Sequence, residues 1–74
     1  MSELTLGQRR VKAEFNPAKD GVVDQIKNKA AELIDLMETL RDERATGERQ
    51  RIISLAQTNV ETAAMYGVKA VFTD

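Results

Sequence analysis

The sequence predicts an all-α fold: an antiparallel two-helix hairpin with an N-terminal arm or short helix, assembling into a homo-oligomer. Two long segments carry apolar residues at alternating spacings of three and four, the pattern of helices that bury one face. The break between them, Ala45-Thr46-Gly47, is short, and a short connection places two helices antiparallel. With 74 residues and no cysteine, the chain is expected to form one domain, residues 1–74, whose small core needs support from oligomerisation.

The first element, residues 1–15, is predicted to be an N-terminal arm. Large apolar residues are sparse in it, and Gly7 disfavours a long helix. We expect this arm to be extended or partly helical and to pack on the main body or on a neighbouring chain. A disordered tail is the open alternative, because chain termini commonly fray.

The first long helix is predicted over residues 17–44. Pro17 fits the first turn of a helix, and Asp20 offers a second start as an N-cap. The stripe expected to face other helices consists of Val23, Ile26, Ala30, Leu33, Met37 and Leu40, and it is widened by Val22, Ile34 and Leu36. A helix this apolar along one side must be covered by another element.

The second long helix is predicted over residues 48–72, with Thr46 as its cap and Gly47 closing the helix before it. Its stripe is Ile53, Ala56, Val60, Ala63, Gly67 and Ala70. Many of these residues are small, so another helix can approach closely. Further apolar residues on the adjoining faces predict that one side packs on the first helix and another on a neighbouring subunit.

The composition argues against catalysis. The chain has no histidine and no cysteine, which excludes a Ser-His-Asp triad, imidazole acid–base chemistry and zinc sites built from these residues. No glycine-rich phosphate loop is present. We therefore expect a protein that is not an enzyme and that has no catalytic residue, no cofactor and no metal site.

The net charge and the hydropathy limit the classes of partner that the chain is expected to bind. The net charge is −1, so no general attraction to DNA or to an anionic membrane surface is expected. No run approaches the ~18 consecutive apolar residues of a membrane span, and no signal peptide is recognised. The sequence favours a soluble intracellular protein.

Acidic residues recur at helical spacing in the first long helix, at Glu32, Asp35, Glu38 and Asp42. They could in principle hold a cation. The favoured interpretation is a solvated face on which Glu38 pairs with Arg41 one turn further on.

Four residues are candidates for ligand binding: Phe15, Lys27, Arg51 and Thr58. Phe15 is either a hydrophobic plug or a stacking platform, and Lys27 is either a ligand contact or a side chain that snorkels over its own interface. Arg51 lies in the first turn of its helix, where it can meet an anion or pair with Glu48. Thr58 belongs to a polar strip within the second helix.

At these positions the chain resembles a known family. The stretches FNPAKDGVVDQIKNKAAELIDLMETL and RQRIISLAQTNVETAAMYGVKAV are similar to the small phage proteins that sponge up cyclic oligonucleotide signals. These are the anti-CBASS sponge proteins and their relatives among the Thoeris anti-defence sponges. The resemblance covers about residues 15–72. Its best-matched parts are Gln25-Ile26-Lys27 and a series along the second helix: Arg51, Thr58-Asn59, Ala64-Met65 and Lys69-Ala70.

The resemblance implies a homohexamer of compact helical protomers in the cytoplasm of an infected bacterial host. It implies that cyclic dinucleotides such as cyclic GMP-AMP bind between two protomers, with Phe15 stacking on a base and Lys27 contacting phosphate. It also implies a separate pocket for cyclic trinucleotides such as cyclic triadenylate, which uses Arg51 and is lined by Thr58.

The function that follows is sequestration, without cleavage, of cyclic oligonucleotide second messengers, which blocks bacterial anti-phage immune signalling. The alternative is a structural helical hairpin that serves as an oligomerisation or adaptor module for a protein partner. A further alternative is capture of an ADP-ribose-type signal at the same pockets.

Overall fold

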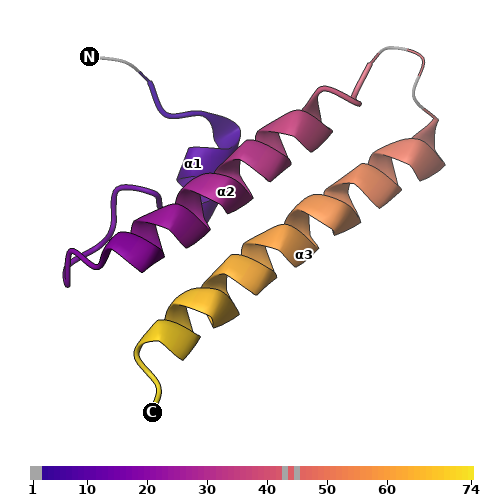
Figure 1. The fold of residues 1–74 in the computed structure, drawn as a ribbon. Helices are drawn as coiled ribbons and strands as arrows, with labels where there is room; N and C mark the ends of the chain where they lie inside the picture. The colour runs from indigo at the N-terminus through magenta and orange to yellow at the C-terminus, as the bar shows by residue number, and fades with distance from the viewer. Residues whose placement is uncertain (1–2, 43, 45) are drawn as a thin grey trace.

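The computed structural model describes residues 3–42, 44 and 46–74. Within this part of the chain there are three helices, α1 (Leu6–Val11), α2 (Gly21–Glu38) and α3 (Gly47–Val71), and no strand. Helices α2 and α3 run antiparallel side by side, and α1 packs mainly on α2 (Figure 1). The predicted antiparallel hairpin with a short N-terminal helix is confirmed, whereas its assembly into a homo-oligomer stays a prediction. None of the three helices is both long and apolar enough to span a membrane.

Local capping chemistry sets where the first two helices begin. Thr5 and Gln8 form a capping box at the start of α1, and Lys12 ends this helix in a left-handed conformation with a φ of 54°. Asp20 caps α2, since its Oδ1 accepts a hydrogen bond of 2.8 Å from the Val22 amide. Of the two predicted starts, the structure therefore uses Asp20, and α2 is shorter than the predicted range of 17–44.

The other end of α2 also lies earlier than predicted. The amides of Leu40 and Arg41 bond to carbonyls three residues back, so the chain tightens into a turn directly after Glu38. The side chain of Thr46 caps α3 by accepting a hydrogen bond of 3.0 Å from the Arg49 amide. Gly47 is consequently the first residue of α3 rather than the residue that closes α2. Residues 43 and 45 of this connection lie outside the described residues.

The core is centred on a face turned about one residue away from the predicted stripe. Ile34 is fully buried, whereas Leu33 and Leu40 of the predicted stripe are each 45 % exposed. In α3 the buried residues are likewise displaced, toward Ala64 and away from Ala63. The core consists of Val11, Val23, Ala31, Ile34, Ile53 and Ala64. The displacement arises because α1 covers one side of α2 and so adds burial there.

A glycine brings α1 close to α2. A Cβ atom added at Gly7 would lie only 2.1 Å from the carbonyl oxygen of Ala31, so no side chain fits there. The Gly7 amide also donates a hydrogen bond of 2.7 Å to Oδ1 of Asp35. The arm contains only a short helix, and Gly7 fixes how this helix docks on α2.

A buried polar network joins α2 to α3 near the turn between them. Gln57 is 1 % exposed, and its Nε2 donates to the Ile34 carbonyl at 3.2 Å and to Oε1 of Glu38 at 2.8 Å. Its Oε1 accepts from Nη2 of Arg41 at 2.9 Å. Every polar atom of the Gln57 side chain thus has a partner, which offsets the cost of burying it.

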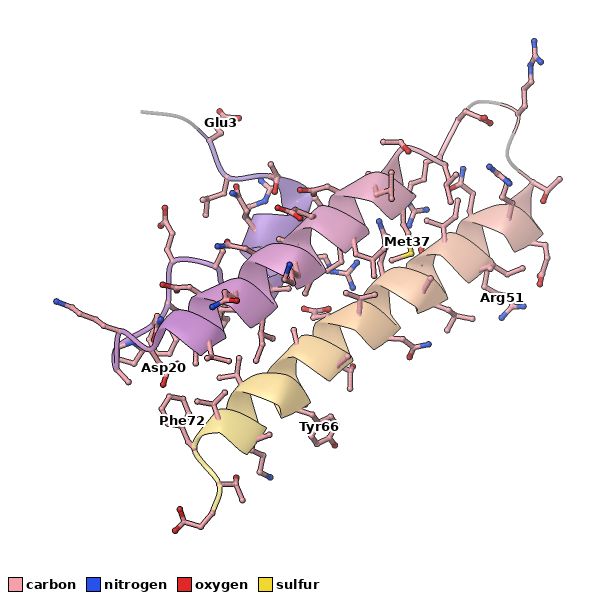
Figure 2. The ribbon with its side chains drawn as sticks, viewed as in Figure 1. Glu3, Asp20, Met37, Arg51, Tyr66 and Phe72 are labelled. Carbon is pink, nitrogen blue, oxygen red and sulfur yellow. The ribbon has the colours of Figure 1, made fainter. Side chains whose placement is uncertain are left out.

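The hairpin is broad and thin, measuring 44 × 33 × 12 Å between Cα atoms, so one broad face stays uncovered. Helical periodicity places seven large apolar side chains on the face opposite α1, and each is 45–65 % exposed. We call this set the outer apolar face: Val22, Leu33, Leu36, Leu40, Ile52, Leu55 and Tyr66. Figure 2 shows Met37 between α2 and α3, with Tyr66 pointing away from α2.

Candidate functional site

Two of the predicted site residues, Phe15 and Lys27, meet where the turn after α1 crosses α2. The side chain of Lys27 is buried, and its Nζ donates hydrogen bonds to the carbonyls of Lys12, at 3.0 Å, and of Phe15. The ring centroid of Phe15 lies 5.4 Å from the same Nζ, within the range of a cation–π contact. The structure therefore brings these two candidates together within one chain.

The solvent exposure of each side chain decides between the two interpretations given to it by the sequence. A buried ammonium is costly unless it is hydrogen-bonded, and two carbonyls meet that need for Lys27. Lys27 does not reach out to water, so its interpretation as a snorkelling residue is wrong. Phe15 is 64 % exposed, so its interpretation as a buried plug is also wrong. An exposed ring with a cation beneath it remains.

A cavity of about 430 Å³ opens beside Lys27, between the end of α1 and the second half of α3. Its charged residues are three cations, Arg10, Lys12 and Lys27, and one carboxylate, Glu61. The rest of the lining is apolar or neutral: Val11, Thr62, Ala64, Met65 and Val68. The cavity thus joins a surplus of positive charge to an apolar wall, which suits an anion that carries a flat organic group.

A second hollow of about 310 Å³ lies on the other side of the turn. It is lined by Leu4, Gln8, Arg9, Lys12, Ala13, Glu14 and Phe15. Lys12 is the residue that borders both hollows. Phe15 lines this second hollow and not the first.

Thr58 belongs to the wall of α3 that meets α1. Its hydroxyl accepts a hydrogen bond of 3.2 Å from Nη2 of Arg10, which also pairs with Glu61 at 2.8 Å. Sequence reasoning missed Arg10 because its partners lie 48 and 51 residues further along the chain. The Arg9-Arg10 pair in an otherwise weakly patterned arm is the signal that could have found it.

Arg51 lies apart from the other candidates, near the start of α3. Its side chain points away from α2 (Figure 2) and pairs with Glu48, three residues earlier, at 3.1 Å from Nε to Oε2. This pairing confirms one of its two interpretations. The hydrogen bond from Arg51 lowers the pKa of Glu48, and the carboxylate in turn raises the pKa of Arg51. Within one chain, Arg51 does not join the cavity beside Lys27.

Two of the predicted acidic residues of α2, Asp35 and Glu38, make structural contacts. Glu38 pairs with Nε of Arg41 at 2.9 Å, which confirms the predicted pairing, and Asp35 holds the Gly7 amide. In the described ranges, no three acidic, histidine or cysteine side chains gather closely enough to hold a metal ion.

Comparison with known proteins gives one family. The family model described as Acb2/Tad1, hairpin domain, matches residues 8–72, from within α1 to the residue after α3. The match spans the whole of α2 and α3, together with the turn that carries Phe15. No curated protein and no solved structure matches the chain.

Proposed function

This chain belongs to the Acb2/Tad1 hairpin family, the anti-CBASS and anti-Thoeris sponge family, and from that membership we propose that it binds and sequesters cyclic oligonucleotide second messengers without cleaving them. Sequestration would block bacterial anti-phage immune signalling, in the cytoplasm of the infected host. The family is one of anti-defence proteins and not a known enzyme family, which agrees with a ligand that is held intact.

The observation that carries the proposal is the junction of Phe15 and Lys27 beside a cavity with surplus positive charge. A cyclic dinucleotide presents two flat bases and two phosphates, so it needs stacking surfaces and cations rather than catalytic groups. An exposed ring such as that of Phe15 supplies stacking, which contributes ~1–3 kcal/mol per base. The cations along the cavity supply the attraction for phosphate.

The proposal includes a homo-oligomer, with a hexamer as the expected assembly. The outer apolar face supports it, because seven large apolar side chains exceed what a small monomer ordinarily leaves in water. A cyclic dinucleotide is nearly two-fold symmetric, so a pocket shared by two copies would offer it one Phe15 and one Lys27 from each. The edge that carries Phe15 would then form one contact of the assembly and the outer apolar face another.

A second pocket for cyclic trinucleotides belongs to the same proposal, with Arg51 and Thr58 as its residues. They lie seven positions apart, so both fall on one side of α3, and both are exposed. A pocket where three subunits meet would collect one Arg51 from each. The guanidinium would exchange its exposed contact with Glu48 for a ligand phosphate.

Titration calorimetry with cyclic GMP-AMP and with cyclic triadenylate tests the function. We expect Lys27→Ala to weaken binding of the dinucleotide and Arg51→Ala to weaken only that of the trinucleotide. Arg44→Ala is the matched control, since it removes an exposed positive charge in the turn between α2 and α3. If neither ligand produced a heat of binding on titration, the proposed function would be contradicted. If each variant lost affinity for both ligands equally, the proposal of two separate pockets would be contradicted. Recovery of intact ligand after heat release from the protein distinguishes sequestration from hydrolysis.

The outer apolar face also favours a second candidate function, an adaptor module that docks a protein partner and binds nothing small. Thermal melting with and without cyclic nucleotides separates the two. A ligand of the native state must raise the melting temperature, whereas an adaptor would melt at the same temperature in both samples.

A further inference from the structure

Arg10 links α1 to α3 at the rim of the cavity beside Lys27. Its Nη2 donates hydrogen bonds to the hydroxyl of Thr58, at 3.2 Å, and to Oε2 of Glu61, at 2.8 Å. Glu61 lines the cavity, whereas Thr58, about one turn earlier on α3, does not. Arg10 is itself a lining residue, so its guanidinium is anchored at the boundary of the cavity.

These contacts leave most of the Arg10 guanidinium available to a ligand. An arginine carries N–H donors on Nε, Nη1 and Nη2, and a phosphate can accept two parallel hydrogen bonds from such a group. Within the part of the chain that the structure describes, Nε and Nη1 of Arg10 form no hydrogen bond. The guanidinium therefore keeps donors for an anion even while Nη2 stays with its partners on α3.

The ion pair between Arg10 and Glu61 is easily exchanged. The two side chains are 23 % and 40 % exposed, and a pair that solvent reaches contributes little to stability. A phosphate competes well for the same group, because its geometry matches the planar guanidinium. Glu61 is the one carboxylate among the described residues that line the cavity, so it is the side chain there that competes with an anionic ligand.

We propose that Arg10 is a second phosphate-binding residue of this cavity, in addition to Lys27, and that Glu61 competes with the ligand for it. In the free protein Glu61 holds the guanidinium, and in the complex a phosphate of the ligand takes its place. This inference rests on the proposed function and adds a residue to it. In a pocket shared by two copies, each copy would offer one Lys27 from α2 and one Arg10 from α1.

The ion pair can be broken from either side, and the proposal predicts opposite effects. The measurement is calorimetric titration with cyclic GMP-AMP at several salt concentrations. Arg10→Ala should weaken binding about tenfold, the size expected for one charge-assisted hydrogen bond. It should also flatten the salt dependence, because salt screens the attraction between a cation and a phosphate.

Glu61→Ala should strengthen binding by up to about fivefold, since it removes a competitor as weak as a solvent-exposed ion pair. It should also make the salt dependence steeper, because the cavity gains positive charge. Arg44→Ala controls for the change in net charge. It removes an exposed cation from the turn between α2 and α3 and should leave the affinity and the salt dependence close to those of the unsubstituted protein.

An ion pair that only fastens α1 to α3 gives a different result. Arg10→Ala and Glu61→Ala would then weaken binding alike and leave the salt dependence unchanged, which would overturn the proposal. Unchanged affinity in Arg10→Ala would overturn it as well. If circular dichroism shows that Arg10→Ala does not fold, Glu61→Ala decides, because weaker binding in that variant contradicts competition for Arg10.

Failure of this inference is distinguishable from failure of the proposed function. If the unsubstituted protein binds no cyclic nucleotide, the proposed function fails and the role of Arg10 fails with it. If the unsubstituted protein binds cyclic GMP-AMP and Arg10→Ala binds it equally well, only the role of Arg10 fails.

Discussion

The absence of a single methyl group decides how α1 lies on α2. Gly7→Ala would drive a Cβ atom into the backbone of Ala31, and backbone cannot move aside as a flexible side chain can. We expect this variant to lose ~1–3 kcal/mol of unfolding free energy or more, measured by urea denaturation.

Gly47→Ala is the matched control for that prediction. An added Cβ at Gly47 meets nothing within 4 Å, and alanine suits the first residue of a helix. This variant should be neutral or should gain up to ~1 kcal/mol. Equal unfolding free energies for the two alanine variants would contradict the close packing of α1.

Glu38 gives the hairpin a sensitivity to acid. The hydrogen bond from Gln57, and then that from Arg41, lowers the pKa of Glu38 below its ordinary value of 4.5. A carboxyl whose pKa is lower in the folded state contributes stability above pH 4.5 and loses it as the pH falls through the folded value. Because the Glu38 side chain is 42 % exposed, solvent screens the effect and keeps it small.

The prediction for Glu38 is a comparison of acid unfolding curves. Glu38→Gln should show a shallower loss of stability below pH 4.5 than the unsubstituted protein, followed by circular dichroism. Glu32→Gln, an exposed carboxyl on the same helix, should follow the unsubstituted curve. A steeper loss in Glu38→Gln would show that the sign of this contribution is wrong.

At the scale of elements, the network around Gln57 joins α2 to α3. Arg41 and Gln57 share a hydrogen bond of 2.9 Å and both contact Glu38, so their contributions should not be additive. A double-mutant cycle of Arg41→Ala and Gln57→Ala, read from urea unfolding, should give a coupling of ~0.5–3 kcal/mol. The same cycle with Arg51→Ala in place of Arg41→Ala should give none, and a coupling of equal size there would contradict the network.

How far the sequence predicted these elements depends on how local each cause is. The hairpin, the cap at Thr46 and the alternative start at Asp20 follow from neighbouring residues, so they could be read from the chain. The displacement of the core from the predicted stripe could not be predicted from the chain, because it depends on α1 covering the side of α2 that carries Ala31. That contact joins segments more than twenty residues apart and rests on one glycine.

The candidate site divides in the same way. Phe15 and Lys27 could be named from their chemistry and from the family resemblance, and the structure brings them together. Arg10 could not, since only the packed fold shows its contacts with Thr58 and Glu61. The two carbonyls that hold Lys27 depend on the left-handed backbone of Lys12, and no sequence pattern indicated that conformation.

At the scale of the whole molecule, a slab 44 × 33 × 12 Å cannot cover both of its faces. We expect Leu33→Glu, which adds a charge to the outer apolar face, to lower the mass measured by sedimentation equilibrium. Burying a charge in an apolar interface is strongly unfavourable, so the smaller species should dominate. Asn28→Glu adds the same charge to an exposed position on another side of α2 and should leave the mass unchanged. An unchanged mass in Leu33→Glu would remove this face from the assembly.

The close approach at Gly7 has a consequence for recognising distant relatives. Apolar residues of a helical stripe interchange freely, so each carries little information about common descent. Any replacement of Gly7 adds at least one carbon atom where none fits, so only glycine should be tolerated at this position. It lies one position before the matched range, residues 8–72. A family profile that also included this position would separate members from unrelated helical hairpins better than several positions occupied by leucine or valine do.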